Sequence, residues 1–367
     1  MEHIPLLQIE DLRTYFYSSA KQAFIRSVDG VDLTIEQGST LGIVGESGSG
    51  KSITMLSTMG LISANPGVLT GKVLLNQKGN PVNLLEGLEQ YVELEHNSGK
   101  ILKLSKDNRA WKKQQEKNMA TVRGKQISMI FQNPKAAMNP YETIGKQISE
   151  MIKLHTEIKD NNSAKEKAIS WLERVKIDSP GMRFENYPHG LSGGMCQRAM
   201  IAMALSSEPS LLIADEPTTG LDATIQSKIV ELLQELQTDL GITTILISHD
   251  ISVITKLADS VAVMYGGKVL ENGPAELVLK ANEDASHPYT RALLASIPDL
   301  SNVDANGRLP AIPGEVLDTI NLTQGCRFYA RCEKFTTQCE SKCKTQEPPL
   351  FRMDGKHHIR CWLFEKG

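Results

Sequence analysis

The sequence predicts an α/β protein whose core is a mainly parallel sheet, preceded by an antiparallel β portion. Three observations support this fold class. A glycine-rich turn directly follows the short apolar strand STLGIV (39–44). The runs LLIAD (211–215) and ITTILIS (242–248) are continuous apolar strands, of the type that is buried in parallel sheets. Helical patterns alternate with these strands, which is typical of layered α/β cores.

The remaining elements follow in chain order. The opening LLQIEDLRTYFY and the run from Phe24 to Glu36 are β-rich stretches separated by turn residues, and they predict the antiparallel portion. Residues 50–61 are expected to form a helix. Residues 135–207 have a mostly helical pattern that interrupts the parallel core.

Composition restricts the class of protein. The chain has 367 residues, 40% of them hydrophobic and 23% charged, with a net charge of -3, which is ordinary for a folded soluble protein and gives no indication of a nucleic-acid binder. No stretch approaches the roughly 18 apolar residues of a membrane-spanning helix, and the first residues lack a signal-peptide pattern. We therefore expect the chain to stay in the cytosol.

A polar insertion is predicted at about residues 78–125. Residues 81–96 carry acidic side chains and no Lys or Arg, whereas residues 100–125 are rich in both. This change of sign suggests a hairpin and a helix with a basic face. It is either a solvated surface or a docking site for a partner or for lipid headgroups.

The residues after strand 39–44 match the phosphate-loop pattern G-x-x-x-x-G-K-[ST]. In such a loop, glycines let backbone N–H groups turn toward phosphate oxygens, and the following helix adds its positive dipole end. Lys51 is expected to reach the terminal phosphates of ATP, and the Ser52 hydroxyl to bind Mg²⁺. The predicted nucleotide-binding residues of the loop are Gly45, Ser47, Gly48, Ser49, Gly50, Lys51 and Ser52.

Two acids follow the strand LLIAD, at the sheet edge where ligands bind in such folds. Asp215 is predicted to hold Mg²⁺, and Glu216 to polarise the water that attacks the γ-phosphate. The alternative is that the two acids form a solvated turn or a helix cap. The phosphate loop favours the catalytic interpretation.

The segment Leu191-Ser192-Gly193-Gly194-Met195 resembles the signature motif of ABC ATPases, a family with a RecA-like core, an antiparallel β subdomain and a helical subdomain. A serine and two glycines at a helix start can present a hydroxyl, backbone amides and a helix dipole to an anion. The resemblance implies that Ser192, Gly193 and Gly194 bind the γ-phosphate of the ATP that the opposite subunit holds.

Further motifs of this family occur in order. The resemblance implies that Gln132 in IFQNP is the Q-loop glutamine, which senses the metal and water and borders the surface where the membrane subunit docks. It also implies that Asp222 belongs to the interface D-loop, that His249 in LISHD contacts the γ-phosphate, and that Phe16 stacks on adenine. Tyr15 and Tyr17, the neighbours of Phe16, are the alternative adenine platforms.

Within the family, the chain resembles the D-type ATPases of oligopeptide and dipeptide importers. The resemblance is carried by RGKQISMIFQNPKAAMNP, YPHGLSGGM, HPYTRALLASIP, LPAIPGE and the cysteine-rich tail. It implies a homologous F-type ATPase partner, two transmembrane permease subunits and an extracellular substrate-binding protein, with this chain peripheral at the cytoplasmic face of the membrane. Cys196 departs from the arginine that is usual in these subunits, which predicts altered electrostatics at the interface.

The alternative function is a soluble ABC ATPase that acts on nucleic acid or ribosomes. Such proteins usually carry two cassettes or a long coiled coil, whereas this chain has one phosphate loop and no sustained heptads. The importer prediction, without a nucleic-acid partner, is therefore favoured. It places an ATPase domain at residues 1–285, with a helical subdomain at about 135–207, and an extension at 286–367 reached through a linker at 298–325.

Five of the six cysteines lie in the last 42 residues. In a reducing cytosol, such clustering favours metal or cluster ligands over disulfides, and four thiolates can bind either zinc or an iron–sulfur cluster. The resemblance favours a 4Fe-4S cluster, with structural zinc and free cysteines as alternatives. Its implied ligands are Cys326, Cys332, Cys339 and Cys361, which leaves Cys343 over, although Cys343 could replace Cys339.

Overall fold

The computed structural model describes residues 5–62, 65–77, 79–97, 100–280, 285–297, 311–320, 322, 324–335, 339–353 and 355–365. The chain forms two compact units. Unit 1 comprises Met1–Glu36, Leu41–Asn118 and His249–Gly367, and unit 2 comprises Gln37–Thr40 and Met119–Ser248. Much of the predicted linker, residues 298–310, lies outside the described residues.

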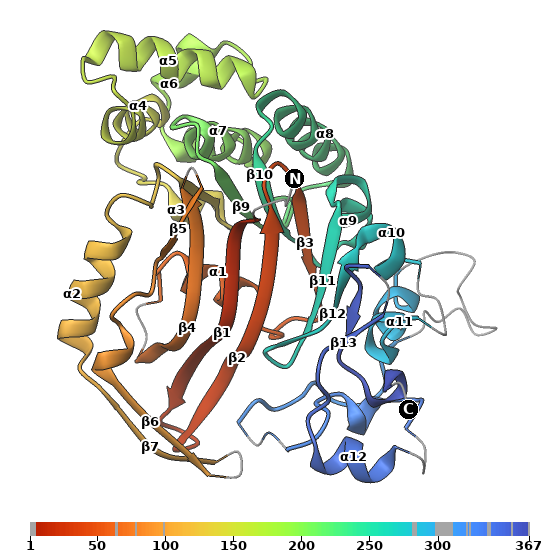
Figure 1. The fold of residues 1–367 in the computed structure, drawn as a ribbon. Coiled ribbons are helices and arrows are strands. Elements are labelled where there is room, and N and C mark those ends of the chain that lie inside the picture. Colours follow the sequence, from red (N-terminus) through yellow and green to blue (C-terminus); the bar gives the residue numbers. More distant parts are fainter. Residues whose placement is uncertain are drawn as a thin grey trace. The chain divides into compact units, whose positions relative to one another are not determined.

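Unit 1 contains the predicted antiparallel portion as a four-stranded sheet in the order β2-β1-β4-β5. Its strands are β1 (Pro5–Ser18), β2 (Ala23–Glu36), β4 (Pro66–Gln77) and β5 (Asn80–Asn83). They pair antiparallel throughout, and the long strands β1, β2 and β4 lie side by side in red and orange (Figure 1). The predicted antiparallel portion is therefore confirmed.

The strand that leads into the phosphate loop belongs to another sheet. β3 (Thr40–Val44) pairs in parallel with β11 (Ser260–Tyr265). β12 (Lys268–Pro274), β14 (His358–Ile359) and β13 (Phe351–Arg352) continue this sheet in antiparallel pairs. Because β14 pairs with β12, the C-terminal tail is built onto the sheet that carries the phosphate loop. Residues on both sides of the predicted boundary at 285 belong to unit 1, and the boundary itself stays a prediction.

The helices of unit 1 flank these strands. The predicted helix at 50–61 is present as α1 (Lys51–Thr58). Besides α2 of the insertion, which is described below, unit 1 also contains α9 (Ile251–Leu257), α10 (Ala275–Val278), α11 (Pro288–Ala295) and α12 (Glu340–Thr345). Single 3-10 turns occur at Tyr329–Arg331 and Trp362–Phe364 in the tail.

Unit 2 contains three parallel strands in the order β10-β9-β8, namely β8 (Ile127–Ile130), β9 (Leu211–Asp215) and β10 (Thr243–Ile247). Every residue of β9 and β10 is buried, which explains their continuous apolar sequences. The predicted parallel strands are confirmed. The helices are α3 (Pro134–Ala137), α4 (Ile144–His155), α5 (Asn161–Arg174), α6 (Pro180–Phe184), α7 (Gly193–Leu205) and α8 (Ala223–Leu240).

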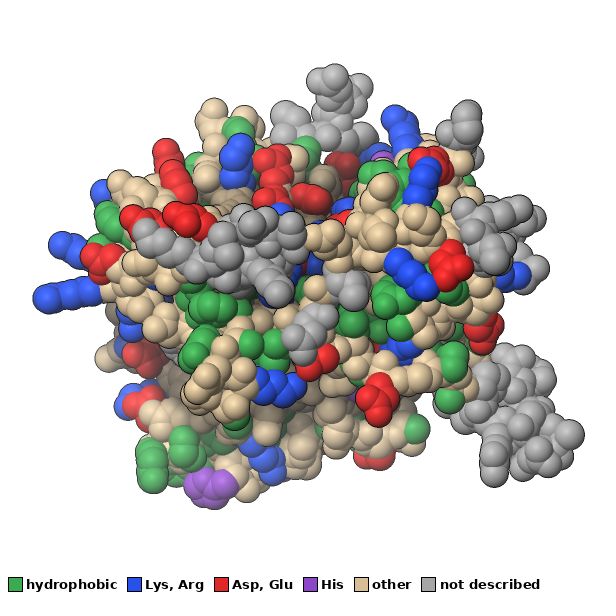
Figure 2. Space-filling model, turned by 90° about the horizontal axis from the view of Figure 1, so that it is seen from below, with side chains coloured by type: hydrophobic (Ala, Val, Ile, Leu, Met, Phe, Trp, Pro, Cys, Tyr) green, Lys and Arg blue, Asp and Glu red, His purple; other side chains and the backbone are tan. Residues whose placement is uncertain are grey.

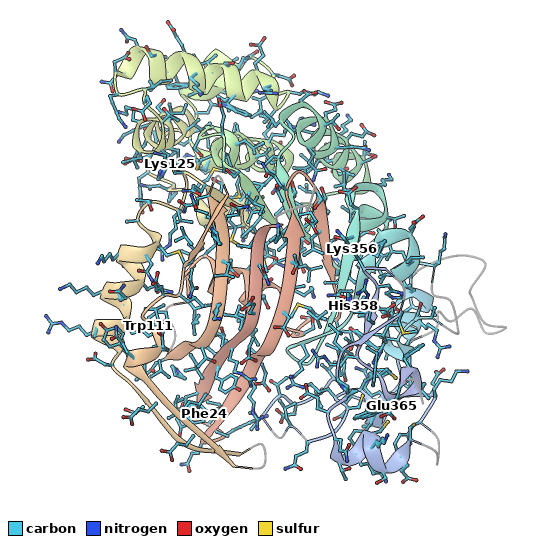
Figure 3. The ribbon with its side chains drawn as sticks, in the orientation of Figure 1. Phe24, Trp111, Lys125, Lys356, His358 and Glu365 are labelled. Carbon is cyan, nitrogen blue, oxygen red and sulfur yellow. The ribbon has the colours of Figure 1, made fainter. Side chains whose placement is uncertain are left out.

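The polar insertion forms the predicted hairpin and helix, as β6 (Val92–Asn97), β7 (Lys100–Lys106) and α2 (Asn108–Met119), after a 3-10 turn at Glu89–Tyr91. Lys106 Nζ lies 3.6 Å from the ring centroid of Trp111 on α2 (Figure 3) and donates to Val68 O at 2.9 Å. Burial lowers the pKa of Lys106 to about 8. The hairpin is thus attached to β4, and the basic residues Arg109, Lys112, Lys113 and Lys117 remain exposed on α2.

Charge is distributed without a dominant sign. On the face drawn in Figure 2, acidic and basic side chains are interspersed, in keeping with the net charge of -3. Among the described residues, no helix has the length and apolar character needed to cross a membrane.

Candidate functional site

The glycines of the phosphate loop occupy backbone positions that other residues rarely adopt. Gly45, Gly48 and Gly50 have φ angles of 149°, 77° and 102°, in the region that favours glycine. A Cβ atom on Gly45 would lie 2.1 Å from Met264 O, and one on Gly50 would lie 2.3 Å from Ser27 O. The loop therefore needs glycine at both positions, for backbone conformation and for space.

Lys51 begins helix α1 and is folded back over the loop. Its side chain is buried, and Nζ donates to Gly45 O at 2.7 Å and to Glu46 O at 3.0 Å. Ser52 lies in the first turn of the same helix. The arrangement places an ammonium group and a helix N-terminus at the concave side of a glycine-rich loop, which is suited to binding phosphate.

In unit 2, the two predicted acids end strand β9. Asp215 is its last residue and is buried. Glu216 has a φ angle of 47°, a strained conformation for a residue other than glycine, and its N–H donates to Ile247 O at 2.9 Å. Strained backbone of this kind is common at functional sites.

The side chain of Glu216 is held by two neighbours. Its Oε2 accepts hydrogen bonds from Gln132 Nε2 at 2.7 Å and from Thr219 Oγ1 at 3.0 Å. Two predicted catalytic residues, far apart in sequence, are thus in direct contact. Sequence reasoning missed Thr219, because a threonine in a turn carries no pattern of its own.

The signature segment starts helix α7. Ser192 is the N-cap, and its Oγ accepts from Met195 N at 3.3 Å. Within unit 2, an open cavity of about 440 Å³ lies beside Gly193, and its lining includes Gln132, Gln197 and Gly220. Asp222 caps helix α8 through a hydrogen bond from Ile225 N at 3.0 Å. The segments predicted to be the signature, the Q-loop and the D-loop therefore border one cavity of the same chain.

The aromatic candidates for adenine differ in exposure. Tyr15 is fully buried, and its hydroxyl donates to Asp29 at 2.5 Å, so it is not available to stack on a base. Phe16 is half-buried on β1. Tyr17 is 50% exposed and packs edge-on against Phe24, which lies near the lower end of β2 (Figure 3). Phe16 and Tyr17 both remain candidates.

His249 is exposed, and it stands two residues before helix α9, which Asp250 caps through Ser252 N at 2.9 Å. The predicted ATP-site residues thus form two groups. Unit 1 carries Phe16, Gly45, Ser47, Gly48, Ser49, Gly50, Lys51, Ser52 and His249, whereas unit 2 carries Gln132, Ser192, Gly193, Gly194, Asp215, Glu216 and Asp222.

All five cysteines of the tail line one small pocket in unit 1, together with aromatic side chains that include Phe328, Tyr329 and Phe335. Among the described residues, none of these five cysteines, nor Cys196, forms a disulfide. Burial raises the pKa of Cys326 to about 11 and that of Cys361 to about 12. Cys343, which the sequence left over, lies in the same pocket as Cys326, Cys332, Cys339 and Cys361.

In the described part of the chain, the shared pocket of the five cysteines is not a recognisable metal-ion site. Among the described residues, no three His, Cys, Asp or Glu side chains are placed to hold a single metal ion. The metal-ligand geometry of the tail therefore gives no support to structural zinc or to the 4Fe-4S cluster that the resemblance implied, and both stay predictions.

Cys196, which departs from the importer pattern, lies on α7 and is completely buried. Its Sγ contacts Pro188 O at 3.3 Å within unit 2. In this chain the side chain acts as a small core residue.

Comparisons with known proteins agree with these features. A family model described as "ABC transporter" matches residues 28–219, and one described as "Oligopeptide/dipeptide transporter, C-terminal region" matches residues 270–339. The oligopeptide transport ATP-binding protein AppD of Bacillus subtilis (strain 168) is 39% identical, over 98% of this chain and 97% of its own length. The oligopeptide transport ATP-binding protein OppD of the same organism is also 39% identical, over 98% and 88%.

Solved structures agree on the fold. The dimeric ATP-binding cassette MJ0796, bound to ADP and Pi, gives a TM-score of 0.57 at 21% identity, over 73% of this chain and 98% of its own. The chain belongs to the ABC transporter ATP-binding family. Within it, the chain carries the C-terminal region of the oligopeptide/dipeptide transporters at residues 270–339.

Proposed function

We propose that this chain is the ATP-binding and ATP-hydrolysing subunit of an ABC transporter that imports oligopeptides, dipeptides or related solutes. The observation that carries this conclusion is the combination of a phosphate loop with Lys51 folded over it and the Gln132–Glu216 pair at the end of β9. The near full-length similarity to oligopeptide transport ATP-binding proteins supports the solute class.

Phosphoryl transfer to water requires positioning and charge stabilisation more than covalent chemistry. We assign the phosphates of ATP to the loop Gly45–Ser52, with Lys51 at the terminal phosphates, and the base role to Glu216. Phe16 stacks on adenine, and His249 contacts the γ-phosphate. Ser52, Gln132 and Asp215 supply oxygen ligands for Mg²⁺, which neutralises charge on the phosphates.

The site is completed by a second chain. Ser192, Gly193 and Gly194 serve the ATP of the partner, and Asp222 lies at the shared interface, so that ATP closes two subunits and hydrolysis releases them. The partner is a homologous F-type ATPase. Two permease subunits and an extracellular substrate-binding protein complete the complex, with this chain at the cytoplasmic face of the membrane.

The partners are tested by purifying the tagged chain from its own cells in mild detergent. We expect two multi-span permeases and a second ABC ATPase to co-purify, in a complex that hydrolyses ATP. Recovery of the chain with ribosomal subunits or nucleic acid, without permeases, would favour the soluble ABC ATPase function instead.

We propose that the tail cysteines hold a 4Fe-4S cluster, a proposal supported by their gathering around one pocket and by the resemblance of the tail to the importer subunits. Four thiolates around one cavity are the ligand set of a 4Fe-4S cluster, and the pocket contributes buried, mostly apolar surroundings. We propose Cys326, Cys332, Cys339 and Cys361 as its ligands. Its role is structural, because the ATPase reaction transfers no electron.

Protein purified without oxygen should be brown and contain iron and acid-labile sulfide. Cys332→Ser should remove both and destabilise the tail, whereas Cys343→Ser should keep the iron content near that of the unaltered chain. Colourless protein with one tightly bound zinc would overturn the cluster assignment and leave the ATPase function intact.

A further inference from the structure

The C-terminal extension contacts the phosphate loop through Arg331. This arginine lies between two of the tail cysteines, directly before Cys332. Its guanidinium forms a two-pronged salt bridge with Glu46, the second residue of the loop, at 2.7 Å (Nη1 to Oε2) and 3.0 Å (Nη2 to Oε1). The Arg331 side chain is 6% exposed and that of Glu46 is 20% exposed, so the pair is largely shielded from water.

The remaining donors of Arg331 are also used. Nε donates to Pro313 O at 2.7 Å, Nη2 to Ile312 O at 3.3 Å, and Nη1 to Tyr265 Oη at 3.3 Å. A guanidinium has five N–H donors in a rigid fork, and here each has an acceptor. The side chain is therefore fixed from several directions, and its fork can fix the Glu46 carboxylate in turn.

A second contact holds the backbone of the same residue. The N–H of Glu46 donates to the Tyr289 hydroxyl at 2.8 Å, and Tyr289 is fully buried on α11. Rings of Tyr265, Tyr289 and Phe328 pack against one another, with centroids 4.7 to 5.4 Å apart. The extension thus contacts both the main chain and the side chain of Glu46.

The neighbouring arginine of the extension reaches the same region. Arg327 follows Cys326, donates to Gly266 O, and pairs with Asp29 at 2.5 Å. The N–H of the adjacent Gly267 donates to Ser49 O in the phosphate loop at 2.9 Å. Both arginines between Cys326 and Cys332 therefore act on segments that border the loop.

From these contacts we infer that the extension is a working part of the ATP site, in which Arg331 is a positioning residue that holds the phosphate loop through Glu46. The motifs HPYTRALLASIP and LPAIPGE supply Tyr289, Ile312 and Pro313 to this arrangement. A loop fixed before ATP arrives loses less conformational freedom on binding, so affinity rises. The inference rests on the proposed phosphate site at Lys51.

The test measures the Kd of a fluorescent ATP analogue with Mg²⁺ and the thermal unfolding midpoint, on the full chain. Arg331→Met and Glu46→Gln should each raise the Kd about 10-fold. The Kd of the double variant should be close to that of each single variant, because the two substitutions break the same Arg331–Glu46 contact. Arg352→Met, the same substitution at an exposed arginine of the extension that donates to Gly355 O, should leave the Kd unchanged.

Arg331→Lys keeps the positive charge but not the forked geometry of the guanidinium, so its Kd should lie between those of the unaltered chain and Arg331→Met. If Arg331→Met does not fold, Arg331→Lys takes its place in the test. A Kd within about twofold of the unaltered chain for Arg331→Met would overturn the inference. The inference would also be overturned if the effects of Arg331→Met and Glu46→Gln on the Kd were additive and paralleled their effects on the thermal unfolding midpoint. Lys51→Ala tests the proposed phosphate site separately from the inference about Arg331. If this variant keeps its affinity for ATP, the proposed phosphate site itself is wrong.

Discussion

Replacing Glu216 with glutamine should slow ATP hydrolysis by roughly 10²-fold or more while ATP still binds, because it removes the carboxylate that acts as general base. Glutamine has almost the same size, and it can still accept from Gln132 and Thr219, the two groups that hold Glu216 in place. The closed pair of ATPase subunits should therefore accumulate. Turnover and nucleotide retention are measured on the assembled transporter.

Glu208→Gln is the matched control for this variant. Glu208 is an exposed residue of the same unit, and its carboxylate pairs with Lys167 at 2.9 Å. Its substitution should leave turnover unchanged, since exposed ion pairs contribute little. Near-normal hydrolysis by the complex that carries Glu216→Gln would show that Glu216 is not the general base.

Replacing Ser192 with arginine should stop turnover of the complex while the phosphate loop of the same chain still binds nucleotide. The signature segment serves the ATP of the partner, and a bulky cation at the N-terminus of α7 blocks that surface and opposes the helix dipole. Binding is measured with a fluorescent ATP analogue on the isolated chain, and hydrolysis on the complex.

Ser163→Arg provides the control, because Ser163 is an exposed serine in the first turn of α5. It should affect neither binding nor turnover. If Ser192→Arg abolished nucleotide binding at its own phosphate loop in a folded chain, the shared-site model would be wrong.

Much of the parallel core could be predicted from sequence, because buried strands leave a continuous apolar run. The apolar run LLIAD predicts a strand at residues 211–215, which are the bounds of β9. The phosphate loop could also be predicted from sequence. Its glycines adopt positive φ angles and lie close to neighbouring backbone, as at Gly45 and Gly50, where a residue with a Cβ atom does not fit. The hairpin and helix of the insertion followed from its change of charge.

Long-range polar contacts were beyond sequence reasoning. Arg331 and Glu46 are 285 residues apart, and neither carries a spacing signal that links it to the other. The same holds for the tail as a whole: nothing in its composition indicates that β14 pairs with β12 and places the tail on the sheet of the phosphate loop. Burial of Tyr15 against Asp29 likewise became visible only in the fold.

The central claim is that ATP hydrolysis by this chain drives solute import. It is tested most directly in vesicles that contain the purified complex, with ATP on the side of this chain and a labelled peptide mixture with the binding protein on the other. The account predicts that peptide crosses to the ATP side only when ATP is present, and that Glu216→Gln stops this movement. A complex that hydrolyses ATP at its full rate and moves no peptide would contradict it.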